Sequence, residues 1–392
     1  MNRVAPLLRL LLTLVLLVAC ATPRGTPGAM ADLKPGERPA LDTDEAGLWM
    51  AMDGVETALK TSGHLLTDPA LNAYVRGIVC RLAGPHCDDI RVYIVETPHF
   101  NASIAPNGMM QVWTGLILRA DNEAQLAYVL GHEIGHYQRR HSVQLFRDLR
   151  AKANASLFFS VLTAAAGVGF VGPLAQLAMV SSVFAFSRDN EREADEVGFE
   201  LMVRAGYDPR EAAKIWEALL AERAAMKDSQ PLIFFATHPP TEERVATLKA
   251  LSEKAQPAGT EPDVGRERFL AATLPFRATM LRDELRLRRP AATQLLLDRL
   301  LAGGTAPGQI HFFQGELHRL RSAAGDDEKA IAAYEKAAAA GEAPPETQRS
   351  LGLVFMKARE NARARAAFAR YLELKPDASD REIIRDYLKK LE

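Results

Sequence analysis

Residues 122–136 read NEAQLAYVLGHEIGH, and this stretch predicts a helix that carries two histidines. Asn122 is followed three residues later by Gln125, a capping-box pattern that predicts the start of the helix. Apolar residues then recur at helical spacing, namely Leu126, Val129, Leu130 and Ile134. Because residues i and i+4 lie on one face of a helix, His132 and His136 can both reach one metal ion.

The residues around this pair indicate catalysis. Glu133 follows the first histidine and can take a proton from a water at the metal. A catalytic zinc also needs a third protein ligand. Residues 187–195 read SRDNEREAD, where Glu191 and Asp195 are again i and i+4, so one carboxylate can bind the metal while the other orients an imidazole. The alternatives are a pair of surface histidines and a solvated charged helix.

HEIGH followed by Ser-Arg-x-x-Glu-x-x-Ala-Asp resembles the gluzincin metallopeptidases, the family of HtpX and the CAAX prenyl protease. Residues 101–200, which include NASIAPNG and TGLILRADNEAQLAYVLGHEIGH, are similar to the catalytic core of that family. The resemblance implies an α+β zincin-like domain, mostly helical with a small sheet, that binds one Zn²⁺ per chain. It also implies the site residues: zinc ligands His132, His136 and Glu191, general base Glu133, and the ligand-orienting Asp195.

Residues 237–240 read THPP, and Arg244 follows shortly after. In BepA-like members of this family a His-Pro loop overlies the zinc site, which implies two possible roles for His238. It either occupies the open coordination position at rest or stabilises the oxyanion when substrate binds. Arg244 is expected to share the second role through charge-assisted hydrogen bonds. A helix-capping turn that happens to contain a histidine is the alternative. His141 does not fit the helical face of His136 and is left out of the predicted site.

Two strands are expected before the HEIGH helix. Residues 90–95 alternate and are β-branched, so they predict a strand. Residues 109–113 follow the turn signal APNG and predict a second strand. The second strand is a candidate edge to which an extended substrate could add by main-chain pairing, with an ordinary sheet strand as the alternative.

The C-terminal part predicts a different domain. Residues 253–266 have the composition of a linker, and 267–392 read as almost entirely helical. This region resembles tetratricopeptide repeats. One unit matches at Leu351, Gly352, Phe355, Ala364, Phe368 and Pro376, and a preceding one at Gly315, Ala330, Tyr334 and Ala337. We therefore expect a metallopeptidase domain over 46–252 and an all-α repeat domain after the linker. A generic Ala-rich helical bundle is the alternative.

The first twenty residues resemble an export signal. Arg3 and Arg9 accompany an apolar stretch at 10–18 that is too short for an ordinary transmembrane helix. It ends in LVAC, which resembles the lipobox of bacterial lipoproteins and of LoiP-like members of the gluzincin family. That resemblance implies acylation at Cys20 and, because Ala21 is not aspartate, anchoring at the outer membrane. The alternative is an ordinary signal peptide that releases a soluble periplasmic protein. Residues 21–45 are rich in Pro, Gly and Ala and predict a flexible tether.

The remaining cysteines agree with an oxidising compartment. Cys80 and Cys87 can close a small disulfide, whereas a zinc knuckle would leave the metal with only two ligands. Two free thiols are the alternative. Residues 157–186 are strongly apolar, but one membrane crossing would separate HEIGH from Glu191. Glycines and a proline divide this run, so it predicts a helical hairpin, either buried or dipped into a lipid interface.

These patterns predict a zinc endopeptidase that degrades misfolded or unassembled envelope proteins. The repeats are expected to recruit the substrate or an outer-membrane assembly machine. The chain has 392 residues and a net charge of −1, which excludes a global basic field for nucleic acid. The alternative function is a periplasmic chaperone or adaptor that acts mainly through its repeats. A membrane-embedded prenyl protease is disfavoured by the export signal.

Overall fold

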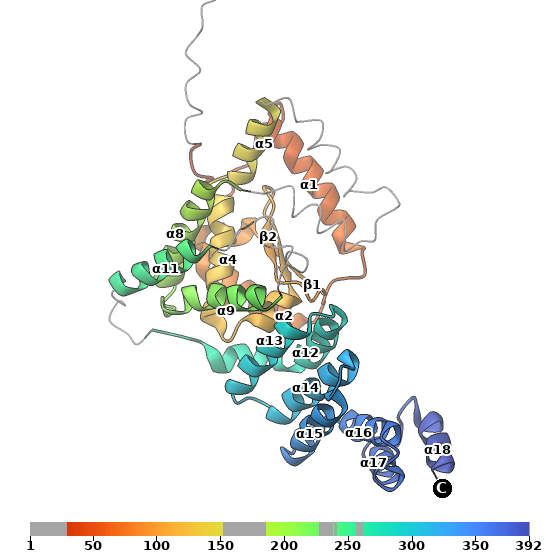
Figure 1. Cartoon of the computed structure of the whole chain (residues 1–392). Coiled ribbons are helices and arrows are strands. Elements are labelled where there is room, and N and C mark those ends of the chain that lie inside the picture. The colour runs from red at the N-terminus through yellow and green to blue at the C-terminus, as the bar shows by residue number, and fades with distance from the viewer. Residues whose placement is uncertain (1–29, 152–185, 227–237, 239–240, 256–261, 392) are drawn as a thin grey trace, which may run out of the picture. The chain divides into compact units, whose positions relative to one another are not determined.

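The computed structural model describes residues 30–151, 186–226, 238, 241–255 and 262–391. Several expectations therefore lie outside the described residues: the export signal with Cys20, most of the apolar run at 157–186, and the Thr-Pro-Pro part of the THPP loop. The described residues form mainly helices with one small sheet (Figure 1). Within them, no helix combines the length and the apolar character needed to span a membrane.

The chain joins the folded body earlier than expected. Leu33 is only 4% exposed, and its N–H donates to the carbonyl of Gln138. The tether predicted over 21–45 is therefore too long, because its last residues are packed on the body. Two helices and a 3₁₀ turn follow, namely α1 (Asp44–Lys60), α2 (Pro69–Ala83) and η1 (Gly84–Asp89). Cys80 and Cys87 form a disulfide between α2 and η1.

The sheet has three strands in the order β1-β3-β2. They are β1 (Arg91–Val95), β2 (Ala102–Ile104) and β3 (Met109–Trp113). The expected strands at 90–95 and 109–113 are confirmed. Of the two alternatives for 109–113, the ordinary sheet strand is confirmed and the free edge is wrong, because β3 pairs in parallel with β1 and antiparallel with β2. Gly108 makes the tight turn into β3: its φ is +84°, and a Cβ there would lie 2.1 Å from the Asp89 carbonyl oxygen.

Helix α4 (Glu123–Gln138) carries HEIGH and forms the centre of the core. Every residue from Glu123 to Tyr137 is buried. The predicted start is confirmed, since the Asn122 side chain accepts from the Gln125 N–H at 2.9 Å. The flanking helices are α3 (Thr114–Arg119), α5 (His141–Ala151), α8 (Arg188–Arg204), α9 (Glu211–Ala225) and α11 (Glu242–Lys254). This sequence of helices, together with the sheet, is the α+β zincin-like arrangement that was expected.

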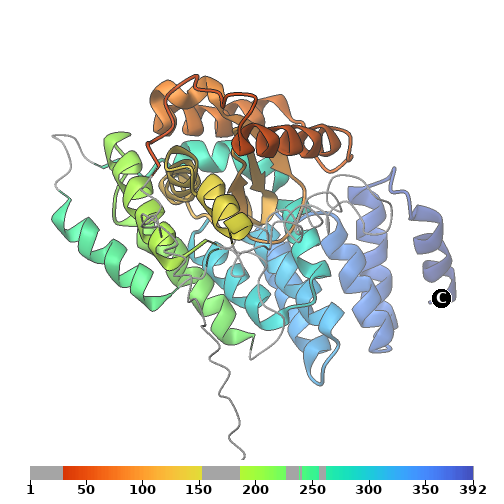
Figure 2. The ribbon, with the colours of Figure 1, turned by 90° about the horizontal axis from the view of Figure 1, so that it is seen from above.

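The C-terminal residues form a series of helices. They are α12 (Arg266–Arg286), α13 (Pro290–Ala302), α14 (Pro307–Arg321), α15 (Asp326–Ala339), α16 (Glu346–Lys357), α17 (Asn361–Leu374) and α18 (Arg381–Lys390). Successive helices pack side by side, most closely α14 on α15 and α16 on α17 (Figure 2). Both pairs meet at a glycine, because an added Cβ would lie 2.4 Å from the Tyr334 ring at Gly315 and 2.5 Å from the Phe368 ring at Gly352.

A buried charge cluster joins this series to the preceding helices. The Arg119 guanidinium in α3 donates to Glu222 of α9 at 2.8 Å and to Glu284 of α12 at 2.9 Å. All three side chains are at most 3% exposed. Burial alone would lower the pKa of Arg119, but the two carboxylates outweigh it and raise the pKa. Helix α12 is therefore part of the same packed core as α3 and α9.

A second charge cluster attaches α1 to the sheet. Glu56 accepts hydrogen bonds from Arg91 Nε at 2.7 Å and from the Tyr93 hydroxyl at 2.6 Å. Burial alone would raise the pKa of Glu56, but these bonds outweigh it and lower the pKa from 4.5 to about 2. The ionised carboxylate thus stabilises the fold above about pH 4.5, and this contribution is lost as the pH falls toward 2.

We expect Glu56→Gln to lower the free energy of unfolding by about 1–2 kcal/mol near pH 7, after allowance for solvent screening. The difference from wild type should shrink as the pH falls below 4.5, because wild-type Glu56 then becomes protonated on unfolding. Urea denaturation between pH 7 and acid pH measures both effects. Glu328→Gln, at an exposed position on α15, is the control. A pH-independent difference would contradict the assignment.

Candidate metal centre

The HEIGH turn lies against α8 at a crossing made by glycines. A Cβ added at Gly198 would lie 2.6 Å from the His132 nitrogen and 2.8 Å from its Cα, closer than real contacts allow. Gly131 and Gly135 face α8 from the other helix, where an added Cβ would meet backbone atoms at 3.0 and 3.1 Å. The two backbones therefore touch, and the first turns of α8 lie beside the two histidines.

The start of α8 places its carboxylates at this crossing. The Ser187 hydroxyl caps the helix and accepts from the Asn190 N–H at 3.1 Å. Glu191 then falls in the first turn, where the helix dipole favours negative charge, and Asp195 follows one turn later. Both carboxylates are buried, at 4% and 3% exposed. This burial excludes the alternative that residues 187–195 form an ordinary solvated charged helix.

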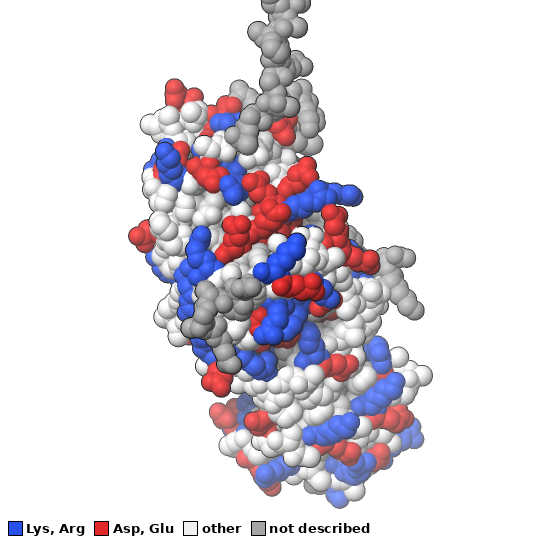
Figure 3. All heavy atoms as spheres, turned by 90° about the vertical axis from the view of Figure 1, so that its left-hand side faces the viewer, with Lys and Arg blue, Asp and Glu red and all other residues white. Residues whose placement is uncertain are grey.

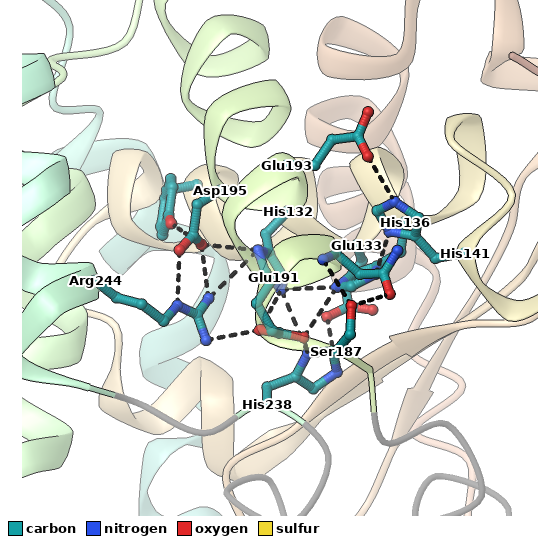
Figure 4. Close-up of polar contacts among 12 residues, drawn as sticks. His132, Glu133, His136, His141, Ser187, Glu191, Glu193, Asp195, His238 and Arg244 are labelled. Atoms are coloured by element: carbon teal, nitrogen blue, oxygen red, sulfur yellow. Dashed lines mark hydrogen bonds and ion pairs between the residues drawn. The ribbon is translucent and has the colours of Figure 1, made fainter. Parts of the chain in front are cut away.

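Four side chains gather around one point, namely His132, His136, Glu191 and His238 (Figure 4). Their potential ligand atoms all lie within 4.8 Å of one another. His132 Nε2 is 3.1 Å from His136 Nε2 and 3.6 Å from Glu191 Oε2, and His136 Nε2 is 3.4 Å from Glu191 Oε1. Two ligands held about 2.0–2.1 Å from a tetrahedral zinc lie roughly 3.3 Å apart, so this set fits zinc.

Asp195 orients one of these imidazoles. Its Oδ1 lies 3.0 Å from His132 Nδ1, so the carboxylate accepts the Nδ1–H and leaves the Nε2 lone pair facing the cluster. The Tyr128 hydroxyl of α4 donates to the same carboxylate at 2.7 Å. Burial alone would raise the pKa of Asp195, but Arg244 and His132 outweigh it and lower the pKa. Asp195 therefore stays ionised and fixes the His132 tautomer.

Arg244 holds the two α8 carboxylates in place. It lies in the first turn of α11, whose N-cap Thr241 accepts from the Arg244 N–H. Its guanidinium donates to Asp195 at 2.6 and 2.7 Å, and its Nη1 lies 2.8 Å from Glu191 Oε2. The Trp216 ring of α9 lies 4.5 Å below it. Because its nitrogen atoms are engaged by carboxylates, this geometry favours a positioning role over the oxyanion role expected for Arg244.

His141 is a second positioning residue, and sequence analysis missed it. Its ring is buried and its Nδ1 lies 2.9 Å from His136 Nδ1, while its Nε2 lies 3.1 Å from Glu193 Oε2. A proton on His136 Nδ1 can thus be donated to His141, which donates in turn to Glu193. Helix α4 ends at Gln138 and Arg140 is left-handed, at φ 57°, so the chain turns back before His141. Helical spacing could not reveal this contact.

Glu133 has the surroundings of a general base. Its side chain is 1% exposed, and its Oε1 has no hydrogen-bond partner among the described residues. Burial raises the pKa of Glu133, because a desolvated carboxylate favours its neutral form. A general base works best when its pKa approaches the operating pH. This oxygen lies beside the ligand set, where it can accept a hydrogen bond from a water once His238 moves away.

His238 is the fourth member of the cluster. Its Nδ1 lies 2.8 Å from Glu191 Oε1 and 3.4 Å from His132 Nε2, and its Nε2 lies 3.7 Å from Glu133 Oε1. Burial alone would lower the pKa of His238, but Glu191 and Glu133 outweigh it and raise the pKa. The imidazole thus stands where the open position of a three-ligand catalytic zinc would be expected.

A cavity of about 160 Å³ opens beside this cluster, between α8 and α11. It is lined by Phe186, Arg188, Glu191, Arg192, Asp195, Glu196, Thr241, Glu243, Arg244 and Thr247. The Phe186 ring also stacks on His136 at 4.0 Å. Acidic and basic side chains are mixed over the molecular face toward which α8 and α11 lie (Figure 3). The cavity therefore borders the carboxylates of Glu191 and Asp195.

Comparisons with known proteins agree with this geometry. Residues 65–252 match the model of Peptidase family M48. The Beta-barrel assembly-enhancing protease of Escherichia coli O157:H7 is 28% identical over 211 residues, 51% of this chain and 42% of that protein. Its Yersinia pestis counterpart is 26% identical over 282 residues, 69% and 55% of the two chains.

A mitochondrial protein is also similar. The Mitochondrial metalloendopeptidase OMA1 of Schizosaccharomyces pombe is 31% identical over 166 residues, 42% of this chain and 47% of that protein. The chain spans about half the length of the curated relatives it matches.

We expect Gly198→Ala to weaken zinc binding by at least about tenfold and to destabilise the fold by about 1–3 kcal/mol, because its methyl group would push α8 away from His132. A competition titration with a chromophoric chelator measures the affinity. Gly77→Ala on α2 is the matched control, since an added Cβ there meets no atom within 4 Å. Unchanged zinc affinity in Gly198→Ala would show that the crossing does not set the ligand geometry.

Proposed function

We propose that residues 65–252, which match the model of Peptidase family M48, form a zinc metallopeptidase domain and that the chain is an endopeptidase of misfolded or unassembled cell-envelope proteins. One observation carries the catalytic part of the proposal. Glu191, from a distant part of the sequence, lies within zinc-coordination spacing of both histidines of HEIGH. Glu133 lies next to the same point with a free oxygen.

In this proposal the residues of the site have three roles: metal binding, proton transfer and orientation of the ligands. His132, His136 and Glu191 would hold zinc, which when bound polarises the substrate carbonyl and lowers the pKa of water. Glu133 Oε1 takes a proton from the attacking water as the oxygen forms the new bond to the carbonyl carbon. It then gives this proton to the amide nitrogen, and the C–N bond breaks as the amine leaves. Asp195, Arg244 and His141 keep the ligands oriented, and Trp216 and Phe186 shield them from bulk water.

His238 regulates access in this proposal. Its Nδ1 lies among the ligand atoms, so the imidazole blocks the position that substrate and water must share. This geometry favours the plug over the oxyanion role for the observed arrangement. Substrate would have to displace His238 before Glu133 can act on a water.

The substrate enters as an extended chain. Among the described strands β2 is bonded on one side only, to β3, and it lies against α4. A substrate strand can add to such an edge by main-chain hydrogen bonds, which tolerate many side-chain sequences. Tolerance of this kind suits a protease for proteins whose common feature is an unpaired, unfolded segment.

The proposed location in the cell envelope is supported by sequence features of the chain and by the names of its relatives. Several relatives are named for the assembly of β-barrels, which belong to outer membranes. The proposed acylation at Cys20 would anchor the chain there, and a soluble periplasmic protein is the alternative. The Cys80–Cys87 disulfide fits an oxidising compartment.

We also propose that α14–α17 are tetratricopeptide-like units that recruit the substrate or its assembly machine. The close contacts of Gly315 with Tyr334 and of Gly352 with Phe368 support this, because small residues facing aromatics are the pattern of such repeats. A second candidate function is an adaptor in which these helices do most of the work. It is favoured only by the observed position of His238, which blocks the site.

We expect Glu133→Gln to reduce casein hydrolysis by at least about 100-fold while zinc content stays at one per chain, because the amide cannot accept the proton of the water. Glu191→Ala should lose both zinc and activity. Metal analysis and a casein assay on the purified proteins test this, with Glu200→Gln at an exposed α8 position outside the cavity as control. Full rescue of a deletion phenotype by Glu133→Gln would favour the adaptor.

We expect His238→Ala to keep zinc, because three ligands remain, and to raise the basal rate of casein hydrolysis. A lower rate with retained zinc would instead assign oxyanion stabilisation to His238. His311→Ala, at a histidine of α14, is the control. Unchanged zinc content and unchanged proteolysis would end the plug proposal.

A further inference from the structure

A groove of about 720 Å³ lies among the C-terminal helices, far along the sequence from the metal ligands. Its volume falls in the range of binding pockets for ligands. It is lined from the end of α12, the start of α13, and α14 and α16. Six of its lining residues are arginines and two are glutamates, so the lining carries a positive excess: Arg282, Arg286, Arg288, Arg289, Arg321, Arg349, Glu316 and Glu346.

Half of these arginines form no ion pair with a carboxylate of a described residue. Arg286, Arg321 and Arg349 pair with Asp283, Asp326 and Asp380, which lie outside the groove lining. Arg282 contacts only the Thr279 hydroxyl, at 3.4 Å, and neither Arg288 nor Arg289 has an ion pair with any described residue. Three guanidinium groups that form no ion pair with a described residue thus lie together in one concave surface, and this local positive excess indicates an acidic ligand.

The two glutamates do not neutralise them. Glu316 binds Arg319, Tyr334 and Ser350, and Glu346 binds Lys375 at 2.8 Å. Their negative charge is thus compensated by other residues.

The Arg289 side chain has a hydrogen-bond donor that no described residue satisfies and that a bound ligand could satisfy. Its Nη1 is buried and has no hydrogen-bond partner among the described residues. A buried donor without a partner costs about 1–3 kcal/mol. Burial lowers the pKa of Arg289, so the charged form is incompletely compensated in the fold. A carboxylate reaching this guanidinium would supply the missing compensation.

Apolar side chains form the rest of the groove. Leu320 is 55% exposed, although large hydrophobic side chains are rarely so exposed in this fold. It stands beside Leu285, Phe312 and Leu317 in the lining. A ligand for this groove therefore needs apolar groups as well as negative charge, which disfavours an inorganic anion or a nucleic acid backbone.

The groove continues toward the metallopeptidase domain. A neighbouring hollow of about 470 Å³ shares Arg288, Arg289 and Pro290 with it and extends to Ala225 and Met226 at the end of α9. Helix α9 also supplies Trp216, which lies against His132 and Arg244. A concave, elongated surface of this kind fits a chain segment better than it fits a flat lipid surface.

We propose that this groove binds an extended polypeptide segment in which acidic and large apolar side chains alternate. An extended chain presents successive side chains on opposite faces, so the acidic face can meet Arg282, Arg288 and Arg289 while the apolar face covers Leu320 and Phe312. The partner is a segment of another protein, and its binding does not require peptide-bond hydrolysis. The proposal therefore stands or falls separately from the proposed catalytic function.

The test uses the zinc-loaded full chain carrying Glu133→Gln, so that no peptide is cleaved. The probe is a fluorescein-labelled peptide of about ten residues with alternating Leu and Glu, and its counterpart has Lys in place of Glu. Fluorescence anisotropy should show binding of the acidic peptide only, weakening as salt is raised. Arg282→Glu with Arg288→Glu should weaken binding by at least tenfold, and Arg365→Glu, an exposed arginine on α17 outside the groove, should not.

The double variant Arg282→Gln with Arg288→Gln should lose an intermediate amount of peptide affinity. It controls for misfolding of the charge-reversed variant, and thermal melting followed by circular dichroism shows whether each variant is folded. Equal binding of both peptides, or binding unaffected by either double variant, overturns the proposal. Two further outcomes also overturn it in favour of another occupant. One is a dimer in sedimentation that the charge reversal abolishes without any peptide binding. The other is capture of the chain by phosphatidylglycerol vesicles that the same reversal prevents.

Discussion

The contact between the backbones of α4 and α8 is the constraint on which the site depends. Gly131 and Gly198 allow the two helices to touch, and at this separation Glu191 reaches both imidazoles of HEIGH. Zinc–ligand distances tolerate errors of only about 0.2 Å. A single methyl group at the crossing would therefore displace α8 by more than a zinc site tolerates. Helix α4 cannot move away to compensate, because all of its residues up to Tyr137 are buried.

Charge balance explains the rest of the site. Glu133, Glu191 and Asp195 bring three carboxylates into a buried space, and Arg244 supplies one permanent positive charge. Buried charges persist only when they are paired or bind a metal. This requirement also explains why Arg244 binds both Asp195 and Glu191. Without the Arg244 charge, these two carboxylates would repel each other one turn apart on the same helix.

Sequence patterns predict those parts of the site that depend on the local geometry of a helix. Helical spacing pairs His132 with His136 and Glu191 with Asp195, and the cap at Asn122 defines where the first of these helices begins. Which carboxylate binds the metal is implied only by the resemblance to the gluzincin family. His141 could not be found in this way, because the chain reverses at Arg140 and the contact is tertiary. The central position of β3 depends on β2, whose three residues are too few to leave an alternating pattern. The docking of Leu33 likewise depends on a partner, Gln138, that is remote in sequence.

The buried Arg119 cluster bears on how recruitment and hydrolysis are related. Replacing one partner of such a cluster leaves an unpaired buried charge, so the arrangement specifies one relative position of α3, α9 and α12. The residues of the arginine-lined groove begin at the end of α12, and its neighbouring hollow ends on α9. Both the groove lining and the helices that surround the metal ligands thus include residues of helices that the Arg119 cluster joins. A single substitution in the Arg119 cluster therefore affects helices of both regions, because α9 and α12 share this buried charge.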